Sequence, residues 1–160
     1  MEEIIDGLWL GNKTDAKRAY YHVPREIDRI LCVHEDLPNN TWGQKWIPIA
    51  NVAYTGVERG YDVVGINMDR LNEACDFIEN ALSRGQSILT HCVAGLERSP
   101  LTVCWYLYTR KHFATLHDAY QHVMKIRPIV QDRTYWLPES VRLEMLGVTG
   151  ASADNNAKNN

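Results

Sequence analysis

The sequence predicts an α/β fold with a central, mainly parallel sheet of about five strands, flanked by helices on both faces. Residues 30–33 and 87–90 are short apolar runs with the length of buried strands. Residues 66–84 carry apolar side chains at helical spacing, and residues 99–111 are a largely apolar helical segment. Strands that alternate with helices in this way are typical of a layered fold with a parallel sheet.

The remaining elements follow from local signals. Residues 4–11 predict two strands bent at a glycine, and residues 12–16 predict a helix start with Thr14 as its cap. Residues 52–57 predict a further strand. Gly85 is a natural stop for the helix within 66–84, and Pro100 fits the first turn of the next helix.

A last helix is predicted after Thr115, which can cap it, with Asp118 three residues on. It should end near Arg127, because Pro128 disfavours helix at the residue before it. The compact domain is therefore expected to span residues 1–147. Residues 148–160 are mostly small and polar and are expected to form a disordered tail.

Composition limits the class of protein. A chain of 160 residues with 45% hydrophobic and 23% charged residues fits one globular domain. The net charge of -3 does not favour nucleic acid or an acidic membrane as partner. The start is acidic, unlike a signal peptide, and the apolar stretch 101–108 is far shorter than the ~20 residues of a membrane span. We expect a cytoplasmic protein.

The four cysteines are widely spaced and form no CxxC pair, so a disulfide framework is not expected. Cys32, Cys75 and Cys104 are predicted to be buried apolar residues. The histidines show no metal-binding spacing, and no metal site is predicted. Cys92 differs from the other three cysteines because of its neighbours.

Residues 88–100 predict a strand, a loop containing Gly95 and a helix start, which together form an anion-binding arrangement. The first N–H groups of a helix lack partners within it, and the helix dipole places partial positive charge there. Gly95 permits backbone angles that other residues resist. Successive N–H groups of such a loop can converge on a tetrahedral oxyanion. We call residues 92–98 the phosphate loop.

Cys92 and Arg98 give this loop its chemistry. A helix N-terminus and nearby positive charge favour the thiolate, which is the attacking form of cysteine. The guanidinium of Arg98 offers a planar fork that matches two phosphoryl oxygens. The Ser99 hydroxyl is placed to donate to the sulfur, and His91 to order the loop by hydrogen bonds.

The pattern of His91 and Cys92, five residues, then Arg98 and Ser99 resembles the signature of cysteine-based protein tyrosine phosphatases. The chain resembles their small (atypical) dual-specificity branch over nearly the whole domain. The matching segments stand in the family's order, at residues 5–12, 54–58 with Asp62, 72–78, and Arg127 with Pro128.

The resemblance implies hydrolysis of phosphotyrosine, and also of phosphoserine or phosphothreonine, in protein substrates, through a phosphocysteine intermediate and without a cofactor. It implies Cys92 as nucleophile, Arg98 as phosphate clamp and Ser99 as the group that helps the sulfur leave. The backbone around the phosphate is contributed by Val93, Ala94, Gly95, Leu96, Glu97 and Arg98.

In the resembled family the general acid is an aspartate on a loop about thirty residues before the cysteine, so the resemblance implies Asp62. Residues 47–51 resemble the strand that leads into the family's acid loop, and Asn51 stands where the branch often has an acidic residue. Glu58 is therefore the main rival of Asp62, and Asp69 a weaker one. Asp62 can equally be a solvated loop carboxylate.

Other functions remain open at this point. The same fold can serve as a non-catalytic phosphoresidue-binding module, but both the nucleophile and the arginine are present. The acidic net charge of the chain disfavours an RNA 5′-triphosphatase, which would bind a polyanion. The lack of a CxxC pair disfavours a thiol redox protein. Glu97 places a negative charge in the loop, which predicts poor activity on phosphoinositides unless that side chain faces solvent.

Overall fold

The computed structural model describes residues 1–22, 26–38, 43–56 and 61–147, except for the side chain of Tyr61. Two earlier expectations therefore lie outside the described residues. These are the disorder of residues 148–160 and the placement of Glu58.

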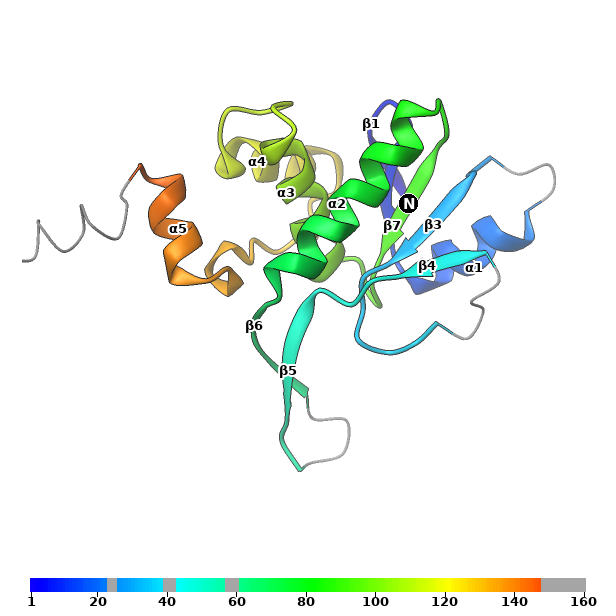
Figure 1. The fold of residues 1–160 in the computed structure, drawn as a ribbon. Helices are drawn as coiled ribbons and strands as arrows, with labels where there is room; N and C mark the ends of the chain where they lie inside the picture. Colours follow the sequence, from blue (N-terminus) through cyan, green and yellow to red (C-terminus); the bar gives the residue numbers. More distant parts are fainter. Residues whose placement is uncertain (23–25, 39–42, 57–60, 148–160) are drawn as a thin grey trace, which may run out of the picture.

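A five-stranded sheet forms the centre of the molecule and confirms the predicted α/β class (Figure 1). Its order is β1-β2-β7-β3-β4, and only β1 is antiparallel to its neighbour. The strands are β1 Glu2–Ile5, β2 Leu8–Gly11, β7 Ile88–His91, β3 Arg29–Cys32 and β4 Gln44–Trp46. Because β7 lies between β2 and β3, its carboxyl end opens at the middle of the sheet edge, where open α/β sheets bind ligands.

Helices cover both faces of the sheet, as predicted. The helices α2 Met68–Ser83, α3 Arg98–Thr109 and α4 Leu116–Ile126 pack on one face, and α1 Lys13–Tyr21 packs on the other (Figure 1). Neighbouring residues of β7 show the two faces. Ile88 belongs to the large cluster beneath α2 and α3, whereas Leu89 packs with Ala16 and Ala19 of α1.

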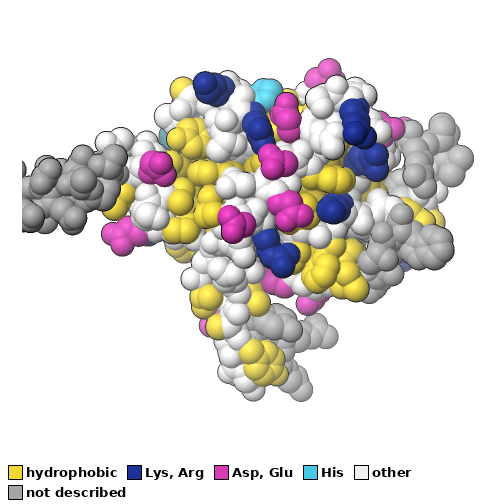
Figure 2. All heavy atoms as spheres, in the orientation of Figure 1, with side chains coloured by type: hydrophobic (Ala, Val, Ile, Leu, Met, Phe, Trp, Pro, Cys, Tyr) yellow, Lys and Arg dark blue, Asp and Glu magenta, His cyan; other side chains and the backbone are white. Residues whose placement is uncertain are grey.

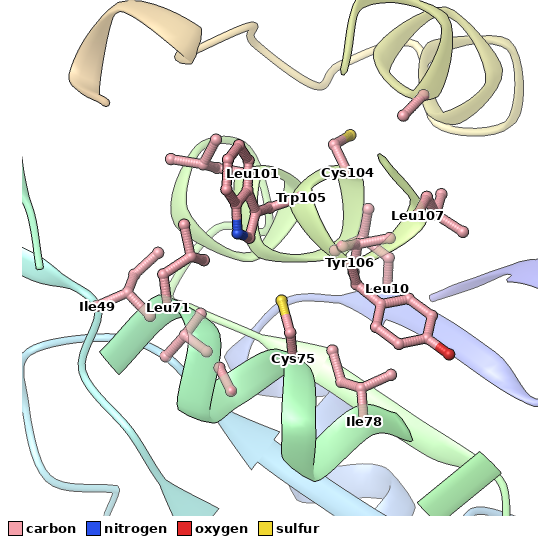
Figure 3. Close-up of a cluster of buried hydrophobic side chains, with 14 of the residues drawn as sticks. Leu10, Ile49, Leu71, Cys75, Ile78, Leu101, Cys104, Trp105, Tyr106 and Leu107 are labelled. Carbon is pink, nitrogen blue, oxygen red and sulfur yellow. The ribbon is translucent and has the colours of Figure 1, made fainter. Parts of the chain in front are cut away.

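The larger core lies between the sheet and the helices α2, α3 and α4. Figure 3 shows Leu71, Cys75 and Ile78 of α2 directed toward α3, and all three are buried. The prediction of buried cysteines is confirmed, since Cys32, Cys75 and Cys104 are free and buried. Burial raises the pKa of the Cys75 thiol to about 12 and that of Cys32 to about 11, so both thiols stay protonated at neutral pH.

One predicted helix cap is wrong. Asn12, not Thr14, caps α1: the Asn12 side chain accepts from the Asp15 N–H at 2.8 Å, and the Asp15 carboxylate accepts from the Asn12 N–H at 2.9 Å. This reciprocal pair begins the helix two residues earlier than Thr14 would. Thr115 caps α4 as predicted, and Gly85 follows α2 with φ +70°.

A separate antiparallel pair, β5 Ala50–Tyr54 and β6 Tyr61–Ile66, extends from the body of the molecule (Figure 1). The sequence predicted a strand over residues 52–57 but not its partner. Beyond α4, the short 3-10 helix η1 Thr134–Trp136 and the helix α5 Glu139–Met145 complete the described chain.

Acidic and basic side chains are interspersed over the α2 side of the molecule (Figure 2). That face therefore carries no large patch of a single sign of charge. Among the residues that the structure describes, no helix has the length and apolar character needed to cross a bilayer.

Candidate active site

The phosphate loop connects the end of β7 at His91 to the start of α3 at Arg98. Gly95 has φ +70°, which confirms the need for a glycine at that turn. Within the described chain, the N–H groups of residues 93–97 donate to no protein acceptor. The loop therefore has five backbone donors beside the N-terminus of α3, and their role as an oxyanion cradle stays a prediction.

Contacts from outside the loop orient these donors. The Arg127 guanidinium donates from Nε to the Gly95 carbonyl at 3.0 Å and from Nη2 to the Ala94 carbonyl at 3.2 Å. The Lys13 N–H donates to the Val93 carbonyl at 2.9 Å. Because C=O and N–H point in opposite directions across a trans peptide, carbonyls anchored outside direct the next N–H groups inward.

Arg127 is itself held in place. Its side chain is 6% exposed, and Nη1 donates to the Glu2 carboxylate at 2.6 Å. The sequence singled out Arg127 only as the residue before Pro128, at the end of a helix. Its contacts with the phosphate loop form only when α4 packs beside that loop.

Cys92 is the first residue of the loop, directly after β7. Its side chain is buried, and Sγ is 3.2 Å from the Ser99 hydroxyl. A hydroxyl donor at that distance stabilises a thiolate, both before attack and when sulfur leaves phosphorus. The structure thus brings Cys92 and Ser99 together, and the roles predicted for them stay predictions.

His91 connects the phosphate loop to β4. Its Nδ1 is 2.9 Å from the Cys92 carbonyl, and its Nε2 is 2.8 Å from the Gln44 side-chain oxygen. Burial lowers the pKa of His91, which favours a neutral ring that donates from Nδ1 to the Cys92 carbonyl. A neutral Nε2 then accepts, so the Gln44 amide must turn its NH₂ toward the ring. These contacts join the start of the loop to β4, and the loop-ordering role of His91 stays a prediction.

The guanidinium of Arg98 is held by a carboxylate that the sequence analysis missed. Glu35 Oε1 accepts from Arg98 Nε at 2.8 Å and from Nη2 at 2.5 Å. The Trp136 ring lies 5.8 Å from the guanidinium carbon. Glu35 uses one edge of the guanidinium, which leaves Nη1 and the second hydrogen of Nη2 for phosphoryl oxygens.

Glu35 also lies beside His34. His34 Nε2 is 3.1 Å from Glu35 Oε2, yet that buried oxygen accepts no hydrogen bond in the described chain. Burial lowers the pKa of His34, although the Glu35 charge opposes that effect. Topology could have pointed to Glu35 as a site residue, because it follows β3 and the carboxyl end of β3 lies beside that of β7.

Glu97 is paired rather than free. Arg133 Nε donates to the Glu97 carboxylate at 2.8 Å, and the Gln131 N–H donates to the Leu96 carbonyl at 2.9 Å. Residues after α4 therefore reach the phosphate loop. The ion pair reduces the repulsion that Glu97 was expected to exert on a second anionic group of a substrate.

The structure does not bring Asp62 into this cluster of contacts. Asp62 is exposed on β6, opposite Ala53, and its carboxylate has no hydrogen bond or ion pair within the described chain. Asp69 is exposed in the first turn of α2. Neither position identifies the general acid, and the role of Asp62 stays a prediction. No group of three or more candidate metal ligands occurs among the described residues.

Replacing Gly95 by alanine should disrupt the cradle. The new Cβ would meet the Gly11 carbonyl oxygen at 2.6 Å and Arg127 Nη2 at 2.8 Å, both of which anchor or border the loop. We expect orthovanadate affinity, measured by calorimetry, to fall by tenfold or more. Gly85→Ala is the matched control, because it has the same φ of +70° and nothing within 4 Å of the added Cβ. Equal affinity in the two variants would contradict this account.

Glu35→Gln should leave Arg98 less firmly oriented and without its counter-charge. We expect a lower melting temperature and roughly tenfold weaker orthovanadate binding, about 1.4 kcal/mol. Asp36→Asn removes the same charge one residue away, at a side chain that is 71% exposed and not in contact with Arg98. Tighter vanadate binding by Glu35→Gln would instead mean that Glu35 competes for the guanidinium.

Comparison with known proteins agrees with this geometry. The family model for the dual specificity phosphatase catalytic domain matches residues 8–138. The human dual specificity protein phosphatase 22 is 31% identical over 115 residues, which cover 71% of this chain and 57% of that protein. Dual specificity protein phosphatase 1 of Arabidopsis thaliana is 36% identical over 145 residues, which cover 88% of this chain and 67% of that protein. The chain thus spans little more than half the length of the human relative.

The fold is shared as well. The crystal structure of DUSP15 superposes with a TM-score of 0.68 at 24% identity, covering 85% of this chain and 81% of that one. The match of the family model includes the whole phosphate loop, and also Lys13 and Arg127, which donate to its carbonyls. The chain belongs to the dual-specificity phosphatase family.

Proposed function

We propose that this protein hydrolyses phosphotyrosine, and also phosphoserine or phosphothreonine, in protein substrates. The observation that carries the proposal is the Cys92 sulfur, which lies 3.2 Å from a buried hydroxyl in a loop with five N–H groups that have no acceptor within the described chain. A thiolate in this setting has donors for the equatorial oxygens of a phosphoryl group and a guanidinium on the same loop. Membership of the phosphatase family supports the reaction class.

The first step forms a phosphocysteine. The Cys92 thiolate attacks phosphorus, a P–S bond forms, and the ester P–O bond breaks with its electron pair on the leaving oxygen. Backbone N–H groups of residues 93–97 and Arg98 stabilise the charge on the equatorial oxygens. A carboxylic acid, in this proposal Asp62, protonates the leaving oxygen.

The second step regenerates the enzyme. Water gives a proton to the same carboxylate and attacks phosphorus, and the P–S bond breaks to release inorganic phosphate. The Ser99 hydroxyl donates to the departing sulfur, which lowers the cost of expelling a thiolate. The protein therefore ends each cycle with its thiolate and carboxylate restored.

The proposed partners are phosphorylated proteins. We also propose that the protein acts in the cytoplasm, because all four cysteines are free and the proposed nucleophile functions only when reduced. The family relationship supports a phosphoprotein substrate without identifying one.

The phosphocysteine is tested by rapid quenching. The protein should release phosphate from p-nitrophenyl phosphate and from phosphotyrosine peptides, and acid-quenched samples should carry one phosphoryl group on the Cys92 peptide by mass spectrometry. Cys92→Ser should lower kcat by roughly 10⁴-fold or more, as expected when the attacking group of an enzyme is removed. The control is Cys75→Ala, a thiol buried in the core. Undiminished turnover by Cys92→Ser would refute the mechanism.

The general acid is tested by leaving group. Asp62→Ala should strongly slow hydrolysis of phenyl phosphate, a poor leaving group, and should slow p-nitrophenyl phosphate much less, with orthovanadate affinity nearly unchanged. Asp69→Ala is measured in parallel. Normal turnover of phenyl phosphate and of phosphotyrosine peptides by Asp62→Ala would exclude Asp62 and direct attention to Glu58.

A further inference from the structure

His34 lies next to the pair formed by Glu35 and Arg98, and the proposed mechanism does not use it. It follows β3, which lies between β7 and β4 in the sheet (Figure 1). Its side chain is 15% exposed, so the ring is mostly buried and only a small part of it contacts solvent. No pattern in the sequence singles out this histidine. Its contacts nevertheless lead to the guanidinium of the phosphate loop.

Two hydrogen bonds fix the orientation of His34. Trp46 Nε1, at the end of β4, donates to the His34 carbonyl at 2.8 Å and holds the backbone. The Asp36 N–H donates to His34 Nδ1 at 3.1 Å and holds the ring. Burial lowers the pKa of His34, so the ring is neutral at neutral pH. A neutral ring that accepts at Nδ1 carries its proton on Nε2, and the backbone therefore selects the tautomer.

This proton-bearing nitrogen faces the second oxygen of Glu35. The distance from His34 Nε2 to Glu35 Oε2 is 3.1 Å, which is within hydrogen-bond range, but the N–H is not aligned with the oxygen in the free protein. Oε2 is buried and accepts no hydrogen bond from the described residues. A buried charged acceptor without a donor is costly. A small rotation of the imidazole would complete the hydrogen bonding of Glu35.

Glu35 is otherwise held at one oxygen only. Its Oε1 accepts both hydrogen bonds from Arg98, at 2.8 Å from Nε and at 2.5 Å from Nη2. A carboxylate held by one oxygen can still turn about its last side-chain bond, because that torsion has a broad energy minimum. A donor on Oε2 would fix the plane of the carboxylate. The direction of the Arg98 guanidinium would then be fixed with it.

We propose that His34 is a positioning residue, which donates from Nε2 to Glu35 Oε2 and so holds Glu35 against Arg98 in the orientation that binds a phosphoryl group. This inference rests on the proposed function, because it concerns how the same site prepares its guanidinium for the substrate. His34 acts through Glu35 and not on the phosphoryl group itself.

The test replaces His34 by phenylalanine and by glutamine. His34→Phe keeps a planar ring but removes the donor, and we expect orthovanadate to bind roughly fivefold more weakly, with a similar fall in kcat/KM. His34→Gln keeps an N–H donor at a similar reach and should restore most of both values. Equal losses in the two variants would show that the shape of the side chain matters and not its donor, which would overturn the inference.

His22→Phe is the matched control. His22 also faces a carboxylate, with Nε2 3.6 Å from Glu26 Oε1, but it follows the end of α1 and its side chain is 53% exposed. We expect orthovanadate affinity and kcat/KM to be unchanged in this variant. A loss as large as that in His34→Phe would mean that the effect is not specific to the contact with Glu35, and the inference would fail.

A double-mutant cycle tests whether His34 acts through Glu35. In the Glu35→Gln background, where a neutral amide replaces the carboxylate, His34→Phe should change orthovanadate affinity by less than twofold. Losses that simply add would mean that the two residues act independently, and the positioning role would be wrong.

Proton exchange at Arg98 gives a readout that does not depend on turnover. The Arg98 Nε–H donates to Glu35, so in ¹⁵N-labelled protein it should exchange with solvent faster in His34→Phe than in the native protein or in His34→Gln. If exchange and orthovanadate affinity change in this way but no phosphoester is hydrolysed, the proposed function fails and the positioning role stands. If phosphoesters are hydrolysed and exchange is the same in all three proteins, the function stands and the positioning role fails.

Discussion

Outward anchoring of the phosphate-loop carbonyls is the interaction on which the site depends. Arg127 binds two of these carbonyls, and the backbone of α1 binds a third. Each anchored carbonyl points outward, so the N–H across the same trans peptide points to the inner side of the loop. The N–H groups of residues 93–97, which have no protein acceptor within the described chain, add partial positive charge there. The arginine that provides most of this anchoring is buried and neutralised by Glu2, so the N-terminal strand and α4 both contribute to the chemistry of a loop far from them in sequence.

A second constraint acts on Arg98. A long, charged side chain loses much conformational freedom when it is held in one geometry, and Glu35 together with Trp136 restrains it in the free protein. The free edge of the guanidinium is thereby presented to a substrate before binding. Preorganised donors cost little reorganisation when charge develops on the equatorial oxygens, which is the main electrostatic advantage of such a site.

Several elements could be predicted because their causes are local. Thr115 and Gly85 mark helix ends through their own hydrogen bonding and backbone angles, and Gly95 is required by a positive φ in the loop. Thr14 failed as a cap because Asn12 competed for the same role and formed a reciprocal pair with Asp15. The β6 strand was missed because a hairpin away from the main sheet has weak burial on either face, so its apolar periodicity is poor.

The sequence by itself determined that Cys92, Arg98 and Ser99 lie together, and it predicted their roles, because all three fall within eight residues of a single strand, loop and helix. The order of strands along the chain also determined the α/β class. Only the tertiary structure decided which groups contact that segment: Glu35 after β3, Arg127 at the end of α4 and the Lys13 backbone at the start of α1. These contacts depend on strands and helices that meet at one sheet edge after folding, and no spacing along the chain encodes their distances.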